Sequence, residues 1–338
     1  MITMDTLASK AAKNAGDIVR LAIKHAPGRK ALVVFDERSP LSRILKDAYR
    51  SALPDAATID FDASTPDSVV AAVTALSPGD LAVLIQSSNF NLAAFRFRIE
   101  MFQRGLAVIE HTHLERATDD AQMATYVDAV AYDAEYYGRL ARPIKAAIDG
   151  AKTVTVRCPG TVLTYEGGME DAKLNVGDYA GMKNVGGTFP IGEVFSEPKD
   201  LAGVNGEAMI FAFAGIDHLV QIHRPFKIRI EAGMLTSHEG PEGFQAVLDQ
   251  IGVAEKVLVR EFGIGLNPAM SKTRTLSDIT AFERQRGLHF SLGEKHGVYK
   301  KPGFNPKKTH YHVDIFVDVE RIEIDGRPLY DGGEFILS

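Results

Sequence analysis

The stretch Ala31-Leu32-Val33-Val34-Phe35, followed by a helical pattern from Pro40 to Ala52, decides the fold class of the first half of this chain. A short apolar run is typical of a strand that is buried on both faces, and a helix directly after it is typical of a parallel sheet. The same alternation continues with strand patterns at 58–61, 81–85 and 106–109 and helical patterns at 67–76 and 93–104. Residues 1–150 are therefore predicted to form a parallel α/β domain.

This half of the sequence carries no phosphate-binding motif. No glycine-rich loop follows the first strand, and no Walker-type Gly-Lys-Ser/Thr tripeptide occurs anywhere in the chain. A parallel sheet alone does not identify a ligand, so no nucleotide cofactor is predicted. We interpret this half as a scaffold or a partner surface.

The pattern changes after a helical segment over residues 134–150. Segments 153–157, 208–213 and 226–230 alternate or are rich in β-forming residues, with glycine-bearing turns between them and one helical pattern at 241–251. Such segments favour an antiparallel or mixed sheet. The expected organisation is thus an α/β domain (1–150) followed by a β-rich domain (151–338), an α/β plus α+β fold.

The composition excludes several classes of protein. Lys and Arg total 38 against 44 acidic residues, a net charge of −6, which argues against a nucleic-acid partner. The only cysteine, Cys158, excludes an intramolecular disulfide framework and a cysteine-rich metal cluster. No apolar run is long enough to span a membrane, and the N-terminus lacks the apolar stretch of a signal peptide. A soluble, cytoplasmic protein is expected.

A histidine and an aspartate near the C-terminus indicate a metal site. His312 and Asp314 lie two residues apart in a strand-like run, so both side chains leave the same face of the strand. An imidazole and a carboxylate together suit zinc, cobalt, manganese or ferrous iron. His310 has the same parity and is a possible further ligand, although the end of a strand is often solvated.

Three other residues in the second half could contribute ligands. Glu193 lies in a segment whose glycines and proline predict a rigid loop, although a solvated turn glutamate is the plainer alternative. Glu261 ends an apolar strand and precedes Gly263-Ile264-Gly265, where a buried carboxylate needs a salt bridge or a metal. His289 precedes an apolar stretch in an expected core strand, where a histidine is more often structural than a ligand.

The remaining histidines have less specific surroundings. His296, seven residues after His289, is open to three interpretations: a proton donor, a substrate contact or a surface residue. We interpret four others as structural residues or as residues at the rim of a substrate site: His111, His113, His218 and His223.

Taken together, these segments resemble the aminopeptidase T and aminopeptidase S family of dinuclear metallo-aminopeptidases. The resemblance rests on Pro190-Ile191-Gly192-Glu193-Val194, on Glu261-Phe262-Gly263-Ile264-Gly265-Leu266-Asn267-Pro268, on Gly287-Leu288-His289-Phe290-Ser291-Leu292-Gly293 and on His312-Val313-Asp314. It covers residues 150–330 well and the first half weakly.

The resemblance implies two divalent ions (zinc, cobalt, manganese or magnesium) and a hydrolase acting on N-terminal peptide or amide bonds. Carried over residue by residue, it implies that the metal ligands are Glu193, Glu261, His289, His312 and Asp314, with Glu261 as the bridge. His296 stands where the family has a catalytic tyrosine, so a hydrogen bond from His296 to the oxyanion is expected. A homodimer and a short-peptide or other small-molecule substrate are also implied.

The 2,5-dihydroxypyridine 5,6-dioxygenases resemble the chain in length and in the C-terminal His-x-Asp. That alternative implies one ferrous ion held by His289, His312 and Asp314, with open positions for a catecholic substrate and dioxygen. Glu193 and Glu261, which such a site does not need, favour the hydrolase. The third alternative is a degenerate member of the family that is not an enzyme and only binds a partner.

Overall fold

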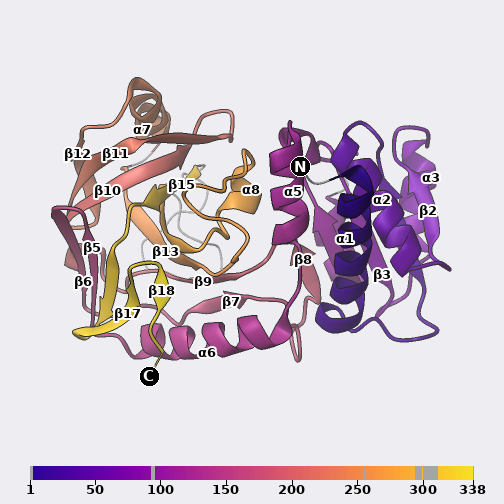
Figure 1. The fold of residues 1–338 in the computed structure, drawn as a ribbon, viewed down its shortest axis with the longest axis horizontal. Coiled ribbons are helices and arrows are strands. Elements are labelled where there is room, and N and C mark those ends of the chain that lie inside the picture. Colours follow the sequence, from indigo (N-terminus) through magenta and orange to yellow (C-terminus); the bar gives the residue numbers. More distant parts are fainter. Residues whose placement is uncertain (1–2, 93–95, 255, 294–298, 300–310, 338) are drawn as a thin grey trace. The chain divides into compact units, whose positions relative to one another are not determined.

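The computed structural model describes residues 3–92, 96–254, 256–293, 299 and 311–337 (Figure 1). Its contacts divide the chain into two compact units. The first comprises residues 1–134 and 177–191, and the second comprises residues 135–176 and 192–338. None of the helices in the described ranges is both long enough and apolar enough to span a bilayer.

The first unit contains a parallel sheet with the strand order β2-β1-β3-β4-β8. Its strands are β1 (Ala31–Phe35), β2 (Ala57–Asp60), β3 (Leu81–Ile85), β4 (Ala107–His111) and β8 (Gly186–Thr188). Its helices are α1 (Met4–Asp17) with the π-helical turn Ile18–Ala22, α2 (Pro40–Ala52), α3 (Pro66–Thr74), α4 (Phe97–Gln103), the short 3₁₀ helix Leu114–Arg116 and α5 (Asp120–Ala129). The predicted parallel α/β domain is confirmed.

The elements of this sheet follow from local sequence signals. Every residue of β1 and β3 is buried, as expected for apolar strands covered on both faces. Helix α2 begins at the predicted residue, because Ser39 caps the helix with its side chain and Pro40 occupies the first turn. Helix α4 starts at Phe97, later than expected, and part of the predicted helix (93–95) lies outside the described residues.

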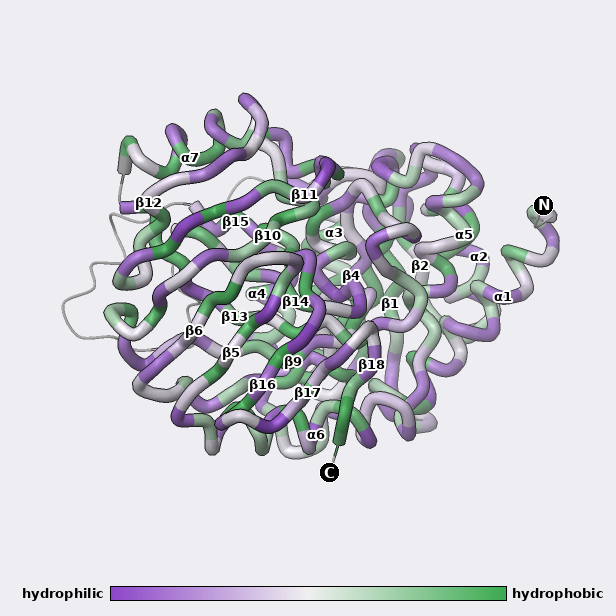
Figure 2. Tube along the Cα trace, turned by 60° about the vertical axis from the view of Figure 1, so that its left-hand side comes forward, coloured by the Kyte–Doolittle hydropathy of each residue, from purple (hydrophilic) through white to green (hydrophobic). Residues whose placement is uncertain are grey.

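The second unit is built on one large, almost entirely antiparallel sheet. Its main strand order in the described residues is β18-β17-β16-β5-β6-β10-β15-β14-β13-β9-β7, and β11 and β12 extend from β10. Helices α6 (Ala134–Gly150) and α7 (Glu242–Ala254) lie at opposite ends of this sheet in two views (Figure 1 and Figure 2). The predicted β-rich half is confirmed.

The strands that matter for the site are β9 (Glu193–Ser196), β13 (Val259–Gly265), β14 (Gly287–Gly293) and β15 (His312–Val317). The remaining elements of the unit are β5 (Thr153–Cys158), β6 (Thr161–Glu166), β7 (Lys173–Asn175), the 3₁₀ helix Leu201–Gly203, β10 (Val204–Ala214), β11 (Val220–Glu231), β12 (Met234–His238), α8 (Ile279–Phe282), β16 (Arg321–Ile324), β17 (Arg327–Asp331) and β18 (Glu334–Phe335).

The division by contacts differs from the expected boundary near residue 150 in two respects. Residues 135–150, which form most of α6, belong to the second unit, and segment 177–191 returns to the first. The second difference has a simple cause, since β8 pairs in parallel with β4 and so joins the α/β sheet. A three-residue strand of this kind leaves no recognisable apolar pattern in the sequence.

Candidate metal centre

The register of four neighbouring strands brings the five candidate ligands to one face of the antiparallel sheet. His312 and Asp314 of β15 lie opposite Gly293 and Ser291 of β14. Residues that are directly opposite each other in a sheet share a face, and so do residues two apart along a strand. His289, four residues before Gly293 on β14, therefore projects from the same face as His312 and Asp314.

The same rule extends across β13 to β9. His289 pairs with Gly263 of β13, and Gly265 of that strand pairs with Glu193 of β9. Glu193 consequently lies on the face that carries His289. It was expected in a rigid loop, but it is the first residue of strand β9, so that prediction of its local structure was wrong.

A β-bulge places Glu261. Val259 pairs with Leu292 and Phe262 pairs with Phe290, so two residues of β13, Arg260 and Glu261, oppose only Ser291. A bulge of this kind redirects a side chain and leaves a backbone group without its ladder partner. Here the backbone N–H of Glu261 donates to Ser291 Oγ at 3.0 Å, which fixes the backbone that carries the carboxylate.

Two glycines in β13 make room for neighbouring groups. A Cβ at Gly263 would lie 2.1 Å from Nε2 of His289, and a Cβ at Gly265 would lie 1.8 Å from the carbonyl oxygen of Gln285. Both distances are far inside van der Waals contact. The Gly-Ile-Gly sequence after Glu261 is therefore explained by the close approach of an imidazole and of a backbone segment.

The ligand atoms form two groups that share Glu261. Glu193, Glu261 and His289 form one group, and Glu261, His312 and Asp314 form the other; within each, the atoms lie within 4.8 Å of one another. Nε2 of His289 lies 3.1 Å from Glu193 Oε1 and 3.4 Å from Glu261 Oε1. Nε2 of His312 lies 3.2 Å from Asp314 Oδ1.

The burial of these groups fits a cation site. Glu193, Glu261, His289 and Asp314 are at most 4% exposed, whereas the His312 side chain is 33% exposed. Glu193 Oε1 and Asp314 Oδ1 are both buried, and each lies next to an imidazole nitrogen, that of His289 and that of His312 respectively. Buried carboxylate oxygens are costly unless they are paired, hydrogen-bonded or bound to a metal. Three carboxylates and two imidazoles are suitable ligands for divalent ions.

The site strongly favours positive charge. Burial would lower the pKa of His312, but the charge and hydrogen bond of Asp314, with Glu261 nearby, raise this pKa to about 10. Burial opposes ionisation of Asp314, yet His312 and His289 lower the pKa of its carboxyl group to about 2. The pKa of His289 is likewise raised, against the effect of burial, by hydrogen bonds to Glu193 and Glu261.

Two charged residues at this site, Glu283 and Arg284, were not predicted from the sequence. Nη1 of Arg284 donates to Glu193 Oε2 at 2.6 Å and lies 2.7 Å from Glu283 Oε1. Burial, opposed by Arg284, raises the pKa of Glu283, and a hydrogen bond links Glu283 to Asp314. Glu283 and Arg284 directly follow the four-residue helix α8, and this local context gives no sequence signal for a metal site.

Two of the predicted site residues lie outside the described residues: His296, proposed for catalysis, and His310, the possible further ligand. His113, His218 and His223 belong to no group of ligand atoms among the described residues. Their interpretation as structural or rim residues stays a prediction.

His111 has a clear structural role in the first unit. Tyr126 OH donates to the carbonyl oxygen of Phe189, so its oxygen accepts from Nδ1–H of His111 at 3.0 Å. Nε2 of the neutral ring then accepts from Tyr49 OH at 2.8 Å. Burial lowers the pKa of His111 to about 3, so the ring is neutral and acts as a hydrogen-bonded core residue.

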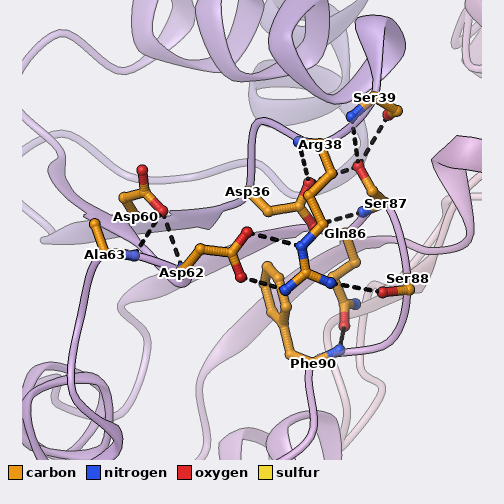
Figure 3. Close-up of polar contacts among 10 residues, drawn as sticks. All are labelled: Asp36, Arg38, Ser39, Asp60, Asp62, Ala63, Gln86, Ser87, Ser88 and Phe90. Atoms are coloured by element: carbon orange, nitrogen blue, oxygen red, sulfur yellow. Dashed lines mark hydrogen bonds and ion pairs between the residues drawn. The ribbon is translucent and has the colours of Figure 1, made fainter.

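A second polar cluster lies at the carboxyl ends of β1, β2 and β3, the edge at which α/β proteins commonly bind ligands (Figure 3). Asp36 accepts from the backbone N–H of Ser87 at 2.7 Å, and Arg38 donates from Nε to Asp62 at 2.7 Å. Arg38 also donates to Ser88 Oγ at 3.0 Å. These polar groups therefore bond to one another at this edge of the sheet.

Two solved structures share the fold of the chain. The 2,5-dihydroxypyridine dioxygenase from Pseudomonas putida KT2440 matches with a TM-score of 0.68 and 15% identity, over 98% of each chain. Wild-type AmpT from Thermus thermophilus matches with a TM-score of 0.63 and 14% identity, over 97% of this chain and 99% of that one. No family model and no curated protein sequence matches. At these identities the likeness shows the fold alone.

Proposed function

We propose that this protein is a metal-dependent hydrolase of the dinuclear aminopeptidase type, which cleaves N-terminal peptide or amide bonds. The observation that carries the proposal is the position of Glu261, whose carboxylate belongs to both groups of ligand atoms. A carboxylate shared by two sets of ligands is suited to bridging two ions. The fold that the chain shares with AmpT is consistent with this assignment.

In this proposal Glu193, Glu261 and His289 would hold one ion, and Glu261, His312 and Asp314 would hold the other. Bound divalent ions would supply a water of lowered pKa and would polarise the scissile carbonyl. The hydrogen bond from the Glu261 backbone N–H to Ser291 Oγ holds the backbone that carries the shared carboxylate. The register of β9, β13, β14 and β15 fixes the other four side chains on rigid strands.

The charge of the site also suits the proposed ions. Among the described residues, the carboxylates of Glu193, Glu261 and Asp314 lie near the buried guanidinium of Arg284. The negative charge that these three carboxylates bring to a buried site attracts metal ions. His296 is proposed to donate a hydrogen bond to the oxyanion, the role given to tyrosine in the resembled family.

The second candidate is a ferrous dioxygenase that cleaves hydroxylated pyridine rings, which the likeness to the Pseudomonas putida enzyme supports. Its expected triad was His289, His312 and Asp314. However, the imidazole of His289 groups with Glu193 and Glu261, while His312 and Asp314 group with each other and Glu261. A single ion held by both histidines is therefore less well supported than two ions.

The test is reconstitution of metal-free protein, under anaerobic conditions, with zinc, cobalt, manganese, magnesium or ferrous iron. Each form is assayed for release of the N-terminal residue from aminoacyl amides and short peptides, and for oxygen uptake with 2,5-dihydroxypyridine. We expect hydrolysis by a form that holds two ions. Oxygen consumption by a form with one iron, without hydrolysis in any form, would replace the hydrolase with the dioxygenase.

His296→Tyr tests the proposed oxyanion contact separately. Because tyrosine has this role in the resembled family, the variant is expected to keep or raise the turnover of an aminoacyl amide. Loss of all turnover at full metal content would remove this role from His296. Light scattering of the purified protein tests the proposed homodimer.

A further inference from the structure

Arg284 gives the two ligand groups different electrostatic surroundings. Its side chain is 10% exposed, and its Nη1 donates to Glu193 Oε2 at 2.6 Å. The backbone of this residue is anchored, since its carbonyl oxygen accepts from the N–H of Asn267 at 3.0 Å. The guanidinium is therefore a fixed, permanent positive charge beside the group that contains Glu193.

Glu283 lies between Arg284 and the other group, since its Oε1 is 2.7 Å from Nη1 of Arg284. Glu283 hydrogen-bonds Asp314, which belongs to the group of Glu261, His312 and Asp314. That group also contains the one candidate ligand with a substantially exposed side chain, His312, at 33%. An ion can therefore approach this group from solvent, where it meets the carboxylates of Glu261 and Asp314.

The arginine acts on the Glu193 group in two ways. It uses one oxygen of Glu193, which leaves Oε1, the atom that faces His289, for an ion. It also repels a divalent cation in a buried site where charges are only weakly screened. Both effects lower the affinity of that group for an ion, and neither reaches the Asp314 group as strongly.

We propose that Arg284 makes the two metal subsites unequal. The subsite of Glu261, His312 and Asp314 fills first and tightly, and the subsite of Glu193, Glu261 and His289 fills second and more weakly. The protein then changes from a one-ion to a two-ion form as the available metal rises. This inference rests on the proposed dinuclear site and adds the order in which that site is loaded.

One opposing effect has to be weighed. Arg284 also orients Glu193, so its removal could disorder a ligand of the second subsite. The orientation of Glu193 depends on a single hydrogen bond from Arg284. The repulsion, by contrast, acts between the guanidinium charge and both positive charges of the incoming ion. We therefore expect the loss of repulsion to exceed the loss of orientation.

The experiment is a calorimetric titration of the metal-free, full-length protein with Co²⁺, followed in parallel by the visible absorption of bound Co²⁺. The wild type is expected to bind two ions in separate steps at least tenfold apart in Kd. Arg284→Gln is expected to strengthen the second step at least tenfold and to merge the two. Arg284→Lys, which keeps the charge, should retain two separate steps.

Arg286→Gln is the matched control, because Arg286 lies two residues further on and pairs with Glu334 rather than with a candidate ligand. Its titration should equal that of the wild type. Two histidine variants assign the steps in the presence of Arg284: His312→Ala should lose the tight step, and His289→Ala should lose the weak one.

The outcomes separate the two proposals. Two ions bound with equal affinity by the wild type, a weaker second step in Arg284→Gln, or loss of the tight step in His289→Ala would each overturn the loading order and leave the dinuclear site standing. A wild type that binds no Co²⁺, or only one ion at saturation, would overturn the dinuclear site as well. The histidine variants decide the order even if Arg284→Gln does not fold.

Discussion

Gly263 lies directly against the imidazole of His289: a Cβ at this glycine would fall 2.1 Å from Nε2, the ring nitrogen that faces Glu193 and Glu261. The absence of a side chain on one strand therefore allows a candidate ligand on the next strand to take its position. This relationship connects the Gly-Ile-Gly sequence to the geometry of the site.

Gly263→Ala tests this relationship. The added methyl group must displace the His289 ring, so the variant is expected to lose metal from the subsite of Glu193, Glu261 and His289, and overpacking should cost about 1–3 kcal/mol of stability. Metal analysis and urea denaturation measure the two effects. Gly252→Ala in α7 is the control, because a Cβ there meets nothing within 4 Å. Unchanged metal content in Gly263→Ala would contradict this role of the glycine.

Ser291→Ala tests the bulge that holds Glu261. The variant removes the acceptor of the buried Glu261 N–H, and an unsatisfied buried donor costs about 1–3 kcal/mol. We expect a lower free energy of unfolding by urea denaturation and a reduced affinity for both ions, since Glu261 belongs to both groups. Ser51→Ala, at an exposed position of α2, should change neither quantity. Wild-type ion affinity in Ser291→Ala would show that the bulge does not position Glu261.

The lowered pKa of His111 predicts that the protein loses stability in acid, and this loss does not depend on the metal centre. Burial lowers its pKa to about 3, so between the usual histidine pKa of about 6.5 and pH 3 the unfolded chain binds a proton that the folded chain does not. Stability from this group is fully present above pH ~6.5 and falls as the pH decreases through this window, by at most about 1.4 kcal/mol per pH unit.

The measurement is the free energy of unfolding of metal-free protein at a series of pH values. His111→Gln removes the titrating ring, so its stability should fall less steeply with acid than that of the wild type. Ser51→Ala, at an exposed position that carries no titrating group, should keep the wild-type slope. Equal slopes for His111→Gln and the wild type would mean that His111 titrates normally.

The sequence predicted the regular elements well where the local signal was strong. The apolar runs gave β1 and β3, and the Ser-Pro start gave α2. The parity of His312 and Asp314 predicted that they share a face, and the register of β15 places both on the face of the site. These features depend only on residues close together in the chain.

The parts that could not be predicted depend on pairing between distant segments. Strand β8 joins the α/β sheet through residues 186–188, and the bulge at Glu261 exists only because of the register between β13 and β14. Arg284 and Glu283 reach the centre because the chain after α8 approaches Glu193, 91 residues earlier. No periodicity in the sequence records such contacts.

The central claim is that one carboxylate, that of Glu261, serves two ions. The most direct measurement is the number of ions per chain, by elemental analysis after equilibration with excess Co²⁺ and removal of unbound metal, in the wild type and in Glu261→Ala. Glu334→Ala, which removes an exposed glutamate, is the control. We predict two ions in the wild type and in the control, and loss of both in Glu261→Ala. Two ions retained by folded Glu261→Ala would contradict the account.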